Sequence, residues 1–388
     1  MVIKHSIIKR KRTIKKTVKG RKNKYDRTKK VVKISRKKSA KTTIKLKKNK
    51  KNPIISPRAE NTWETWQTFN PTAILIEKKI QFLYRAIGED CLSRVGYAAS
   101  DNGSDIYDRL PYPVYEHLSQ QQSFPPKADQ PLSNNIFSYL SGGSWGGAED
   151  PRIVRVDEEN VLYMTYTICN GDLRVVLTSI KVEDFLNKKW KWKSPVIISP
   201  PGELHKNWVI FPNKINGKYA ILLSVVPEVE VAYFDNLDFD GTTFINSMRG
   251  FGPLKNNFSK NCWDKWIRGV GPVPIKTKYG WLIFYHAIDN DWSKYKVGAM
   301  LLDLENPTKI LYRSKKPVLE PDQLYENNGF KGGVVYASGA VVKNGNLLVY
   351  YGSADNYICV ASANLDKFLE ELKKGQQPKL KSKMTRKK

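Results

Sequence analysis

Acidic residues are almost missing from the two ends of this 388-residue chain. Residues 1–58 hold 25 of the 66 Lys and Arg residues with a single acid, Asp26, and residues 373–388 hold eight more Lys and Arg with no acid. The stretch between these tails has 33 basic and 36 acidic residues, so the formal charge of +29 belongs to the tails. A nearly neutral body is not expected to take a polyanion as its substrate.

Long hydrophobic runs and paired cysteines are also missing. The longest apolar run, residues 219–226, is far shorter than the roughly 20 residues that cross a bilayer. The N-terminus lacks the pattern of a secretory leader, and the four cysteines lie far apart with no CxxC spacing, which favours free thiols in a reducing compartment. We therefore expect an intracellular protein without membrane contact, for which the basic tail allows nuclear or particle-associated targeting.

Motifs for metals and cofactors are absent as well. The four histidines, His5, His117, His205 and His286, are scattered without metal-ligand spacing. The sequence contains no phosphate-cradling loop and no GxGxxG before a helix. We expect no resident cofactor.

The N-terminal 58 residues are expected to form a disordered arm, because their charges repel one another and few apolar residues are available to bury. This predicts three parts: the arm, a catalytic body over residues 59–374 and a basic tail over residues 375–388. The arm should bind nucleic acid through its charge, without reading sequence. Deleting residues 1–56 should leave the stability of the body unchanged.

The body repeats one pattern five times: a strand, a tight turn, an aromatic strand and a third strand. The copies begin near residues 69, 149, 208, 271 and 334. This predicts an all-β fold, a five-bladed β-propeller, with a two-sheet sandwich as the competing architecture. Apolar residues at helical spacing over 365–373 predict one C-terminal helix.

Propellers carry their sites where the innermost strands begin and the loops between blades meet. The residues at these positions are carboxylates, cations and amides: Asn70, Glu149, Asp150, Lys206 and Asn207 before or in first strands, and Arg85, His286 and Asp355 after second strands. Such a set suits a ligand with many hydroxyl groups, which indicates a sugar.

Several strings resemble glycoside hydrolase family 130, whose members are β-mannoside phosphorylases and related β-mannosidases on a five-bladed propeller. The matching strings are Asn70-Pro71, 83–85, 148–152, 269–274, 280–282, Tyr285-His286, 301–304, 317–321, Tyr325-Glu326 and 350–355. The resemblance covers about residues 65 to 372, in the order expected for the family.

The resemblance implies an inverting reaction on a β-linked mannose-containing oligosaccharide, with Asp150 as the single general acid. It also implies that Asn70, Arg85 and Asp355 bind the sugar at the cleavage subsite, and Glu149 stands beside them. We expect the neighbouring Glu149 and a channel position to raise the pKa of Asp150 toward that of a proton donor. The alternative is that Asp150 only caps the turn that starts a strand.

One departure from the family concerns phosphate, the nucleophile of its phosphorylases. The family has a His-Arg-Pro segment after the Gly-Lys-Tyr turn, and residues 220–228 contain neither the His nor the Arg. The remaining candidates for phosphate contact are Lys206, Arg268, His286 and Tyr295. Phosphorolysis with inorganic phosphate as co-substrate and hydrolysis both stay open.

A hydrolase that inverts needs a second carboxylate as the base for water. Glu228 and Glu230 lie at the end of the segment that lacks the His and the Arg, and they are the first candidates for this base. Glu320 and Glu326 are candidates farther along the chain. The competing hypothesis from another class is a catalytically inactive glycan-binding or scaffold propeller, anchored to nucleic acid or a particle by the arm. Neither the linkage nor the oligomeric state follows from the sequence.

Overall fold

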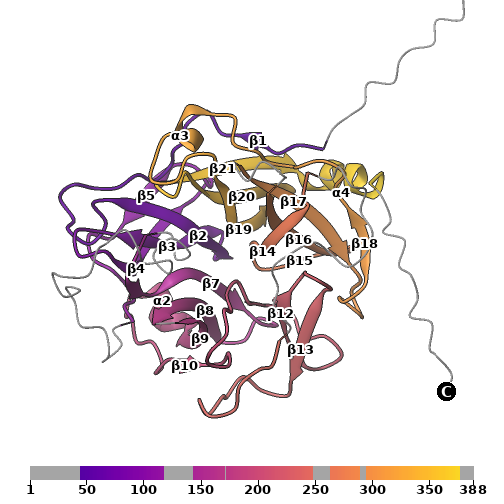
Figure 1. The fold of residues 1–388 in the computed structure, drawn as a ribbon, viewed down its shortest axis with the longest axis horizontal. Helices are drawn as coiled ribbons and strands as arrows, with labels where there is room; N and C mark the ends of the chain where they lie inside the picture. The colour runs from indigo at the N-terminus through magenta and orange to yellow at the C-terminus, as the bar shows by residue number, and fades with distance from the viewer. Residues whose placement is uncertain (1–43, 118–142, 171, 248–262, 289–293, 376–388) are drawn as a thin grey trace, which may run out of the picture. The chain divides into compact units, whose positions relative to one another are not determined.

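Five antiparallel sheets form a ring around one axis in the computed structural model, which describes residues 44–117, 143–170, 172–247, 263–288 and 294–375 (Figure 1). The predicted five-bladed β-propeller is confirmed. Blade 1 contains β2 (Gln67–Ile76), β3 (Lys79–Ile87), β4 (Leu92–Ser100) and β5 (Ile106–Arg109), and β6 (Gly146–Gly147) pairs in parallel with β4. Blade 2 contains β7 (Glu149–Arg155), β8 (Val161–Asn170), β9 (Asp172–Lys181) and β10 (Val196–Ile197), and the short α2 (Val182–Leu186) follows β9.

The remaining blades complete the ring. Blade 3 contains β11 (Val209–Ile210), β12 (Tyr219–Ser224) and β13 (Glu230–Phe234). Blade 4 contains β14 (Trp266–Val270), β15 (Ile275–Thr277), β16 (Gly280–Ile288), β17 (Tyr295–Leu302) and β18 (Ile310–Arg313), and α3 (Leu324–Asn327) follows it. Blade 5 contains β19 (Val335–Lys343), β20 (Asn346–Ser353), β21 (Tyr357–Asn364) and β1 (Lys47–Lys48).

Tight turns join the first and second strands of the blades as the sequence predicts. Asn344 and Gly345 between β19 and β20 both have positive φ angles, 50° and 72°. Two successive positive φ angles are typical of the type I′ turn, whose twist matches that of the flanking strands. Asn216 and Gly217 before β12 have the same signature, with φ angles of 53° and 78°.

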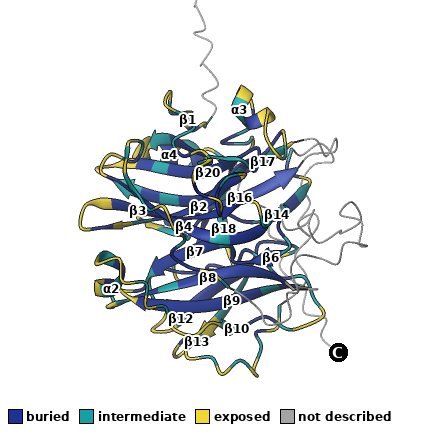
Figure 2. Cartoon of the chain, turned by 90° about the vertical axis from the view of Figure 1, so that its left-hand side faces the viewer, coloured by how far each residue is buried: buried dark blue, intermediate teal, exposed yellow. Residues whose placement is uncertain are grey.

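The hydrophobic core lies between the blades, and the buried strands of Figure 2 show it as stacked dark layers. Each of five apolar clusters joins two neighbouring blades, so every blade is held on both sides. Phe82 of blade 1, for example, meets Tyr350 of blade 5 edge-to-face with ring centroids 4.7 Å apart. Because burial is shared around the ring, no blade has a core of its own.

The ring is closed by the N-terminal strand, and this corrects the boundary expected at residue 58. β1 pairs with β21, with Lys47 opposite Ser362 and Lys48 opposite Ala361 (Figure 1). Leu46 and Ile55 on either side of β1 are buried, with 5% and 3% of their surface exposed. The physical reason is that β21 would otherwise present an unpaired edge. Expectations for residues 1–43 and 376–388 lie outside the described residues.

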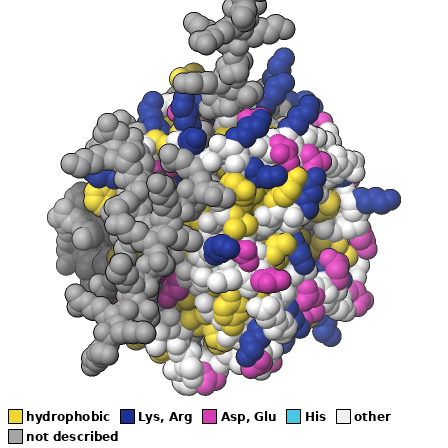
Figure 3. All heavy atoms as spheres, turned by 90° about the vertical axis from the view of Figure 1, so that its right-hand side faces the viewer, with side chains coloured by type: hydrophobic (Ala, Val, Ile, Leu, Met, Phe, Trp, Pro, Cys, Tyr) yellow, Lys and Arg dark blue, Asp and Glu magenta, His cyan; other side chains and the backbone are white. Residues whose placement is uncertain are grey.

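The C-terminal helix is confirmed as α4 (Leu365–Lys373), with Phe368, Leu369 and Leu372 buried. The Asn364 side chain caps it by accepting a hydrogen bond from the Lys367 N–H at 3.1 Å. None of the helices in the described ranges has the length and apolar character needed to span a membrane. On the face shown in Figure 3, Lys and Arg stand among Asp and Glu, in line with the near-neutral charge of the body.

Candidate active site

The pairing of the first strand is interrupted in four blades, at one residue or two. Register shifts, typical of β-bulges, fall within β2, β7, β14 and β19. The interrupted positions hold Asn70-Pro71, Asp150-Pro151, Arg268 and Ser338. Because a bulge leaves its extra residue unpaired and turns the side chain, it directs polar groups toward a site.

Unusual backbone angles mark two of these positions and two other predicted site residues. Asn70, Asp150, Asn207 and Asp355 have positive φ angles of 46°, 50°, 64° and 49°. Asn and Asp tolerate this region better than other residues, because their short polar side chains can bond locally. Strained backbone at several predicted site residues is typical of a functional site.

Four of the predicted residues form one buried group, which we call the axial cluster: Asn70, Arg85, Glu149 and Asp150. The Asn70 amide donates to Asp150 Oδ1 at 2.9 Å. The Arg85 guanidinium lies 3.3 Å from Asp150 Oδ1 and 3.5 Å from Glu149 Oε2. The hydrogen bonds that Asp150 makes with described residues therefore fall on Oδ1, which leaves Oδ2 for a ligand.

Two serines that the sequence analysis missed support this cluster. Ser144 accepts a hydrogen bond from Arg85 and donates one to Glu149 Oε1, both at 2.9 Å. Ser93 accepts from Arg85 Nε at 2.8 Å. The guanidinium is thus fixed on several sides, which holds the two carboxylates in one orientation.

The two neighbouring carboxylates of the axial cluster have opposite pKa shifts. Burial raises the pKa of Glu149 to about 7, against the attraction of Arg85. For Asp150, burial acts in the same direction, but Arg85, Arg152 and the Asn70 hydrogen bond outweigh it and lower the pKa. The predicted rise of the Asp150 pKa is therefore wrong. The nearby cations stabilise the ionised carboxylate of Asp150 more than burial destabilises it.

Asp355 supplies a third buried carboxylate near the cluster. Burial raises its pKa to about 6, while Lys331 and Arg85 act to lower it. Its backbone carbonyl accepts a hydrogen bond from the Gln67 amide at 2.7 Å. The negative charge of Asp150 is among the causes of its shift, which places Asp355 within electrostatic range of the axial cluster.

Two further residues of the site, Arg152 and Tyr336, were missed. Arg152 Nη2 donates to the Tyr336 hydroxyl at 3.3 Å, and that hydroxyl donates to Asn207 Oδ1 at 2.7 Å. Tyr336 lies near the start of the first strand of blade 5, so the rule that selected Asn70 and Asp150 would have found it. The buried Asn70 Oδ1 has no hydrogen-bond partner among the described residues, which is expected where a ligand completes the set.

A small polar pocket beside the cluster contains two cations. Lys206 and Arg268 line it together with Ser224 and Ser247, and its volume is about 30 Å³. Burial lowers the pKa of Lys206, and the charge of Arg268 lowers it further, whereas Tyr295, Asp150 and Glu149 raise it. Of the candidate phosphate contacts, the structure thus brings Lys206 and Arg268 together with Tyr295 nearby.

His286 does not fit its expected part as a phosphate contact. Its side chain is completely buried and lies flat on Tyr336, with ring centroids 3.8 Å apart. Burial lowers the pKa of His286 to about 3, so the ring is neutral. Its Nε2 lies 2.7 Å from the Ala337 carbonyl oxygen, which makes Nε2 the donor of a bond that orients the strand.

The candidate bases are spread over different parts of the described structure. Glu228 is exposed on the turn before β13. Glu230 accepts a hydrogen bond from Ser247, a residue of the polar pocket, at 2.7 Å. Glu320 pairs with Lys45 at the surface, and Glu326 is buried against Lys48, so these two lie with β1 and not with Asp150.

A metal centre finds no support in the part of the chain that the structure describes. No three His, Cys, Asp or Glu side chains gather there as metal ligands would. The polar groups of the site are directional hydrogen-bond donors and acceptors, which can bind hydroxyl groups and transfer a proton.

Comparisons with known proteins agree with this arrangement. Residues 35–374 match the sequence profile of a family described as beta-1,4-mannooligosaccharide phosphorylase. A 1,2-beta-oligomannan phosphorylase of Thermoanaerobacter sp. is 34% identical over 80% of this chain and 94% of the relative. A beta-1,2-mannobiose phosphorylase of the same organism is 31% identical over 81% of this chain and 96% of the relative.

A solved structure shares the fold. The beta-1,2-mannobiose phosphorylase from Listeria innocua, in complex with β-1,2-mannobiose, superposes with a TM-score of 0.62 at 23% sequence identity, over 84% of this chain and 99% of that one. The profile match spans all five blades and begins before β1. The chain therefore belongs to glycoside hydrolase family 130, the β-mannoside phosphorylase family.

Proposed function

We propose that this chain is an inverting β-mannoside phosphorylase that uses inorganic phosphate as its co-substrate. The observation that carries the proposal is the polar pocket in which Lys206 and Arg268 lie together. Two cations that repel each other gain from an anion between them, and Lys206 also acts on Asp150 and Glu149. A phosphate dianion bound in this pocket would lie near Asp150, the proposed proton donor.

In the proposed reaction, a phosphate oxygen attacks the anomeric carbon of the terminal mannosyl unit. The bond from that carbon to the glycosidic oxygen breaks, and Asp150 gives its proton to this oxygen. The products are α-mannose 1-phosphate and a shortened oligosaccharide. Asn70, Arg85 and Asp355 would hold the hydroxyl groups of the mannosyl unit, because together they offer both hydrogen-bond donors and hydrogen-bond acceptors.

The lowered pKa of Asp150 requires a proton store, and Glu149 suits this task. Its pKa of about 7 leaves it partly protonated near neutrality. The charge of Asp150 raises the pKa of Glu149, so the two carboxylates titrate as a coupled pair. An oligosaccharide that displaces water around Asp150 would also raise its pKa, by the desolvation that already acts on it.

The linkage proposed is β-1,2. The two relatives that are more than 30% identical over about 80% of this chain carry β-1,2-linked substrates in their names, whereas the family description and a relative at 27% identity over 78% of the chain name 4-linked substrates. The competing hydrolytic reaction would use water activated by a carboxylate, for which Glu230, bonded to Ser247 of the polar pocket, is a candidate.

The test is to incubate the protein with β-1,2- and β-1,4-mannobiose, each with and without phosphate. We expect phosphate-dependent formation of α-mannose 1-phosphate, fastest from the β-1,2 isomer. Lys206→Met or Arg268→Met should raise the KM for phosphate by about 10²-fold, because each removes a charge-assisted contact. Lys214→Met, which alters a partly exposed Lys paired with Glu159, should leave that KM unchanged. Release of free mannose at the same rate without phosphate would replace this proposal by hydrolysis.

A further inference from the structure

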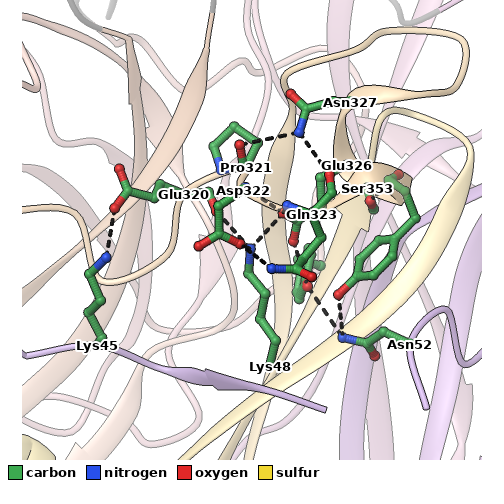
Figure 4. A network of polar contacts seen from close by, with 12 residues as sticks. Lys45, Lys48, Asn52, Glu320, Pro321, Asp322, Gln323, Glu326, Asn327 and Ser353 are labelled. Carbon is green, nitrogen blue, oxygen red and sulfur yellow. Dashed lines mark hydrogen bonds and ion pairs between the residues drawn. The ribbon is translucent and has the colours of Figure 1, made fainter. Parts of the chain in front are cut away.

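A lysine of the N-terminal strand reaches into a buried polar network on blade 5 (Figure 4). Lys48 Nζ lies 2.6 Å from Glu326 Oε2 and 2.5 Å from Asp322 Oδ1, and it donates to the Glu320 carbonyl at 2.8 Å. The Lys48 side chain is 13% exposed and that of Glu326 is 0% exposed. We call Lys48, Asp322, Glu326 and Tyr351 the closure network.

Glu326 is the centre of this network, and described groups surround its carboxylate. The Tyr351 hydroxyl donates to Oε1 at 2.9 Å. The backbone N–H groups of Asp322 and Gln323 both donate to Oε2 at 2.8 Å. The carboxylate therefore fixes the start of α3, and the Lys48 ammonium is the charge that balances it.

The segment after α3 connects this network to the candidate active site. The Glu326 carbonyl accepts a hydrogen bond from Gly333 N–H at 2.9 Å, which closes residues 326–333 into a loop. Within the loop, Lys331 N–H donates to the Ala354 carbonyl at 2.8 Å. A side chain at Gly329 would come within 2.7 Å of Ala354 Cβ, so the loop lies directly against the turn that carries Asp355.

The tip of this loop also reaches the support of the axial cluster. Phe330 is 61% exposed, and a Cβ at Gly143 would lie only 2.7 Å from its ring. Gly143 precedes Ser144, which bonds both Arg85 and Glu149. Lys331 Nζ lies 4.8 Å above the Tyr295 ring. The loop thus presents an open aromatic ring and a cation beside the site.

We propose that Lys48 is a positioning residue for the active site: by holding Glu326 it fixes the 326–333 loop, and thereby the placement of Asp355 and Phe330 toward the glycan. The proposal rests on the proposed function for the nature of the ligand. It does not require Lys48 to touch substrate. It links the N-terminal strand, which closes the ring, to the affinity of the site.

The test compares Lys48→Met with Lys45→Met at a temperature well below the unfolding midpoint of each variant. Lys45 is the matched control, because it lies on the same segment and pairs with Glu320 at the surface, with its side chain 53% exposed. Lys48→Met should raise the KM for β-1,2-mannobiose about 10-fold and change kcat by less than about 3-fold. Lys48→Arg, which keeps the charge, should recover most of the affinity, and Lys45→Met should leave both constants unchanged.

Glu326→Gln provides a second variant should Lys48→Met fail to fold. It keeps an acceptor for Tyr351 and for the two backbone N–H groups but removes the charge, so we expect a smaller rise in KM, about 3-fold. Combining Lys48→Met with Phe330→Ala should give less than the product of the two single effects, because both act through the same loop. Lower unfolding midpoints with unchanged KM in both network variants would overturn the proposal and leave β1 a purely structural strand.

Failure of the proposed function can be told apart from failure of this inference. Calorimetric binding of β-1,2-mannobiose requires no turnover. If the parent binds this disaccharide but does not cleave it with phosphate, the phosphorylase proposal fails, and the Lys48→Met dissociation constant still tests positioning. Equal dissociation constants for the parent and Lys48→Met would overturn the inference whatever the reaction is.

Discussion

The axial cluster and the closure network both bury carboxylates beside a cation, yet they differ in how completely their polar groups are paired. Glu326 is contacted at 2.6–2.9 Å by an ammonium, a hydroxyl and two backbone N–H groups. In the axial cluster Arg85 lies 3.3 and 3.5 Å from its two carboxylates, and Asn70 Oδ1 has no described partner. A fully paired group stabilises the fold, whereas an incompletely paired one is ready to bind something else.

Among the residues that the structure describes, the closure network is one of three similar arrangements, whereas the axial cluster has no counterpart in them. In blade 1 the Tyr84 hydroxyl donates to Glu64, which pairs with Arg109 on β5. In blade 4 the Tyr285 hydroxyl donates to Asp264, which pairs with Arg313 on β18. In each case a tyrosine on the second strand meets a buried carboxylate and a cation on the fourth strand. Repetition around the ring indicates a structural device, and Lys48 supplies its cation in blade 5.

The largest expected effect comes from removing the strand that carries Lys48. Deleting residues 1–52 takes away β1, leaves Glu326 without the Lys48 cation and exposes the apolar surface against which Leu46 packs. Together these losses should lower the free energy of unfolding by on the order of 5 kcal/mol. Deleting residues 1–43 should leave the unfolding midpoint within about 1 °C of the parent. Thermal denaturation of both truncations measures the difference, and equal midpoints would mean that β1 contributes nothing to closure.

The next effect belongs to the axial cluster and concerns rate, not stability. Asp150→Asn keeps the size of the side chain but cannot deliver a proton, so turnover of β-1,2-mannobiose should fall by about 10² to 10⁴. Substrates whose leaving group departs without protonation should be affected less. Steady-state kinetics measure both, with calorimetry to show that the sugar still binds.

Glu149→Gln is the comparison that assigns the acid. If turnover survives in Asp150→Asn and is lost in Glu149→Gln, then Glu149 donates the proton and Asp150 only shapes the site. Loss in both variants would fit a proton shared by the pair.

The sequence predicted the fold well because a propeller repeats its pattern. Five copies of a strand triplet, with turns such as Asn344-Gly345, specify both the blades and their number. It also predicted which residues meet at the axis, because Asn70, Glu149 and Asp150 stand at equivalent places in their repeats. The directions of the pKa shifts of Glu149 and Asp150 depend on burial and on the distances to Arg85 and Arg152, which the order of residues along the chain does not contain.

The N-terminal segment was misjudged for a different physical reason. Lys45, Lys47, Lys48, Lys50 and Lys51 have the composition of a solvated tail, and composition averages over residues. Only two of them form β1, and the acids that pair with Lys48 lie more than 270 positions away in sequence. The segment is recognised only by its pairing with β21, which the composition of residues 44–58 does not reveal.

The smallest expected effect is a pH dependence of stability that arises from Glu149. Its pKa is about 7 in the folded protein, against an ordinary value of 4.5. Between these pH values the folded state keeps a proton on Glu149 that the unfolded chain has released. The contribution of this group to folding stability is therefore complete below pH 4.5 and is lost as the pH rises through 7. Over this range stability should fall by on the order of 3 kcal/mol.

Glu149→Gln tests this by fixing the group in a neutral form. Urea denaturation from pH 4.5 to 7.5 should show a flatter fall for this variant than for the parent, with a remainder from Asp355, whose pKa is also raised by burial. Glu158→Gln, at a side chain that is 85% exposed, serves as the control and should run parallel to the parent. A parent whose stability does not change between pH 5 and 7 would mean that Glu149 is ionised and well paired, and the contrast between the axial cluster and the closure network would then not hold.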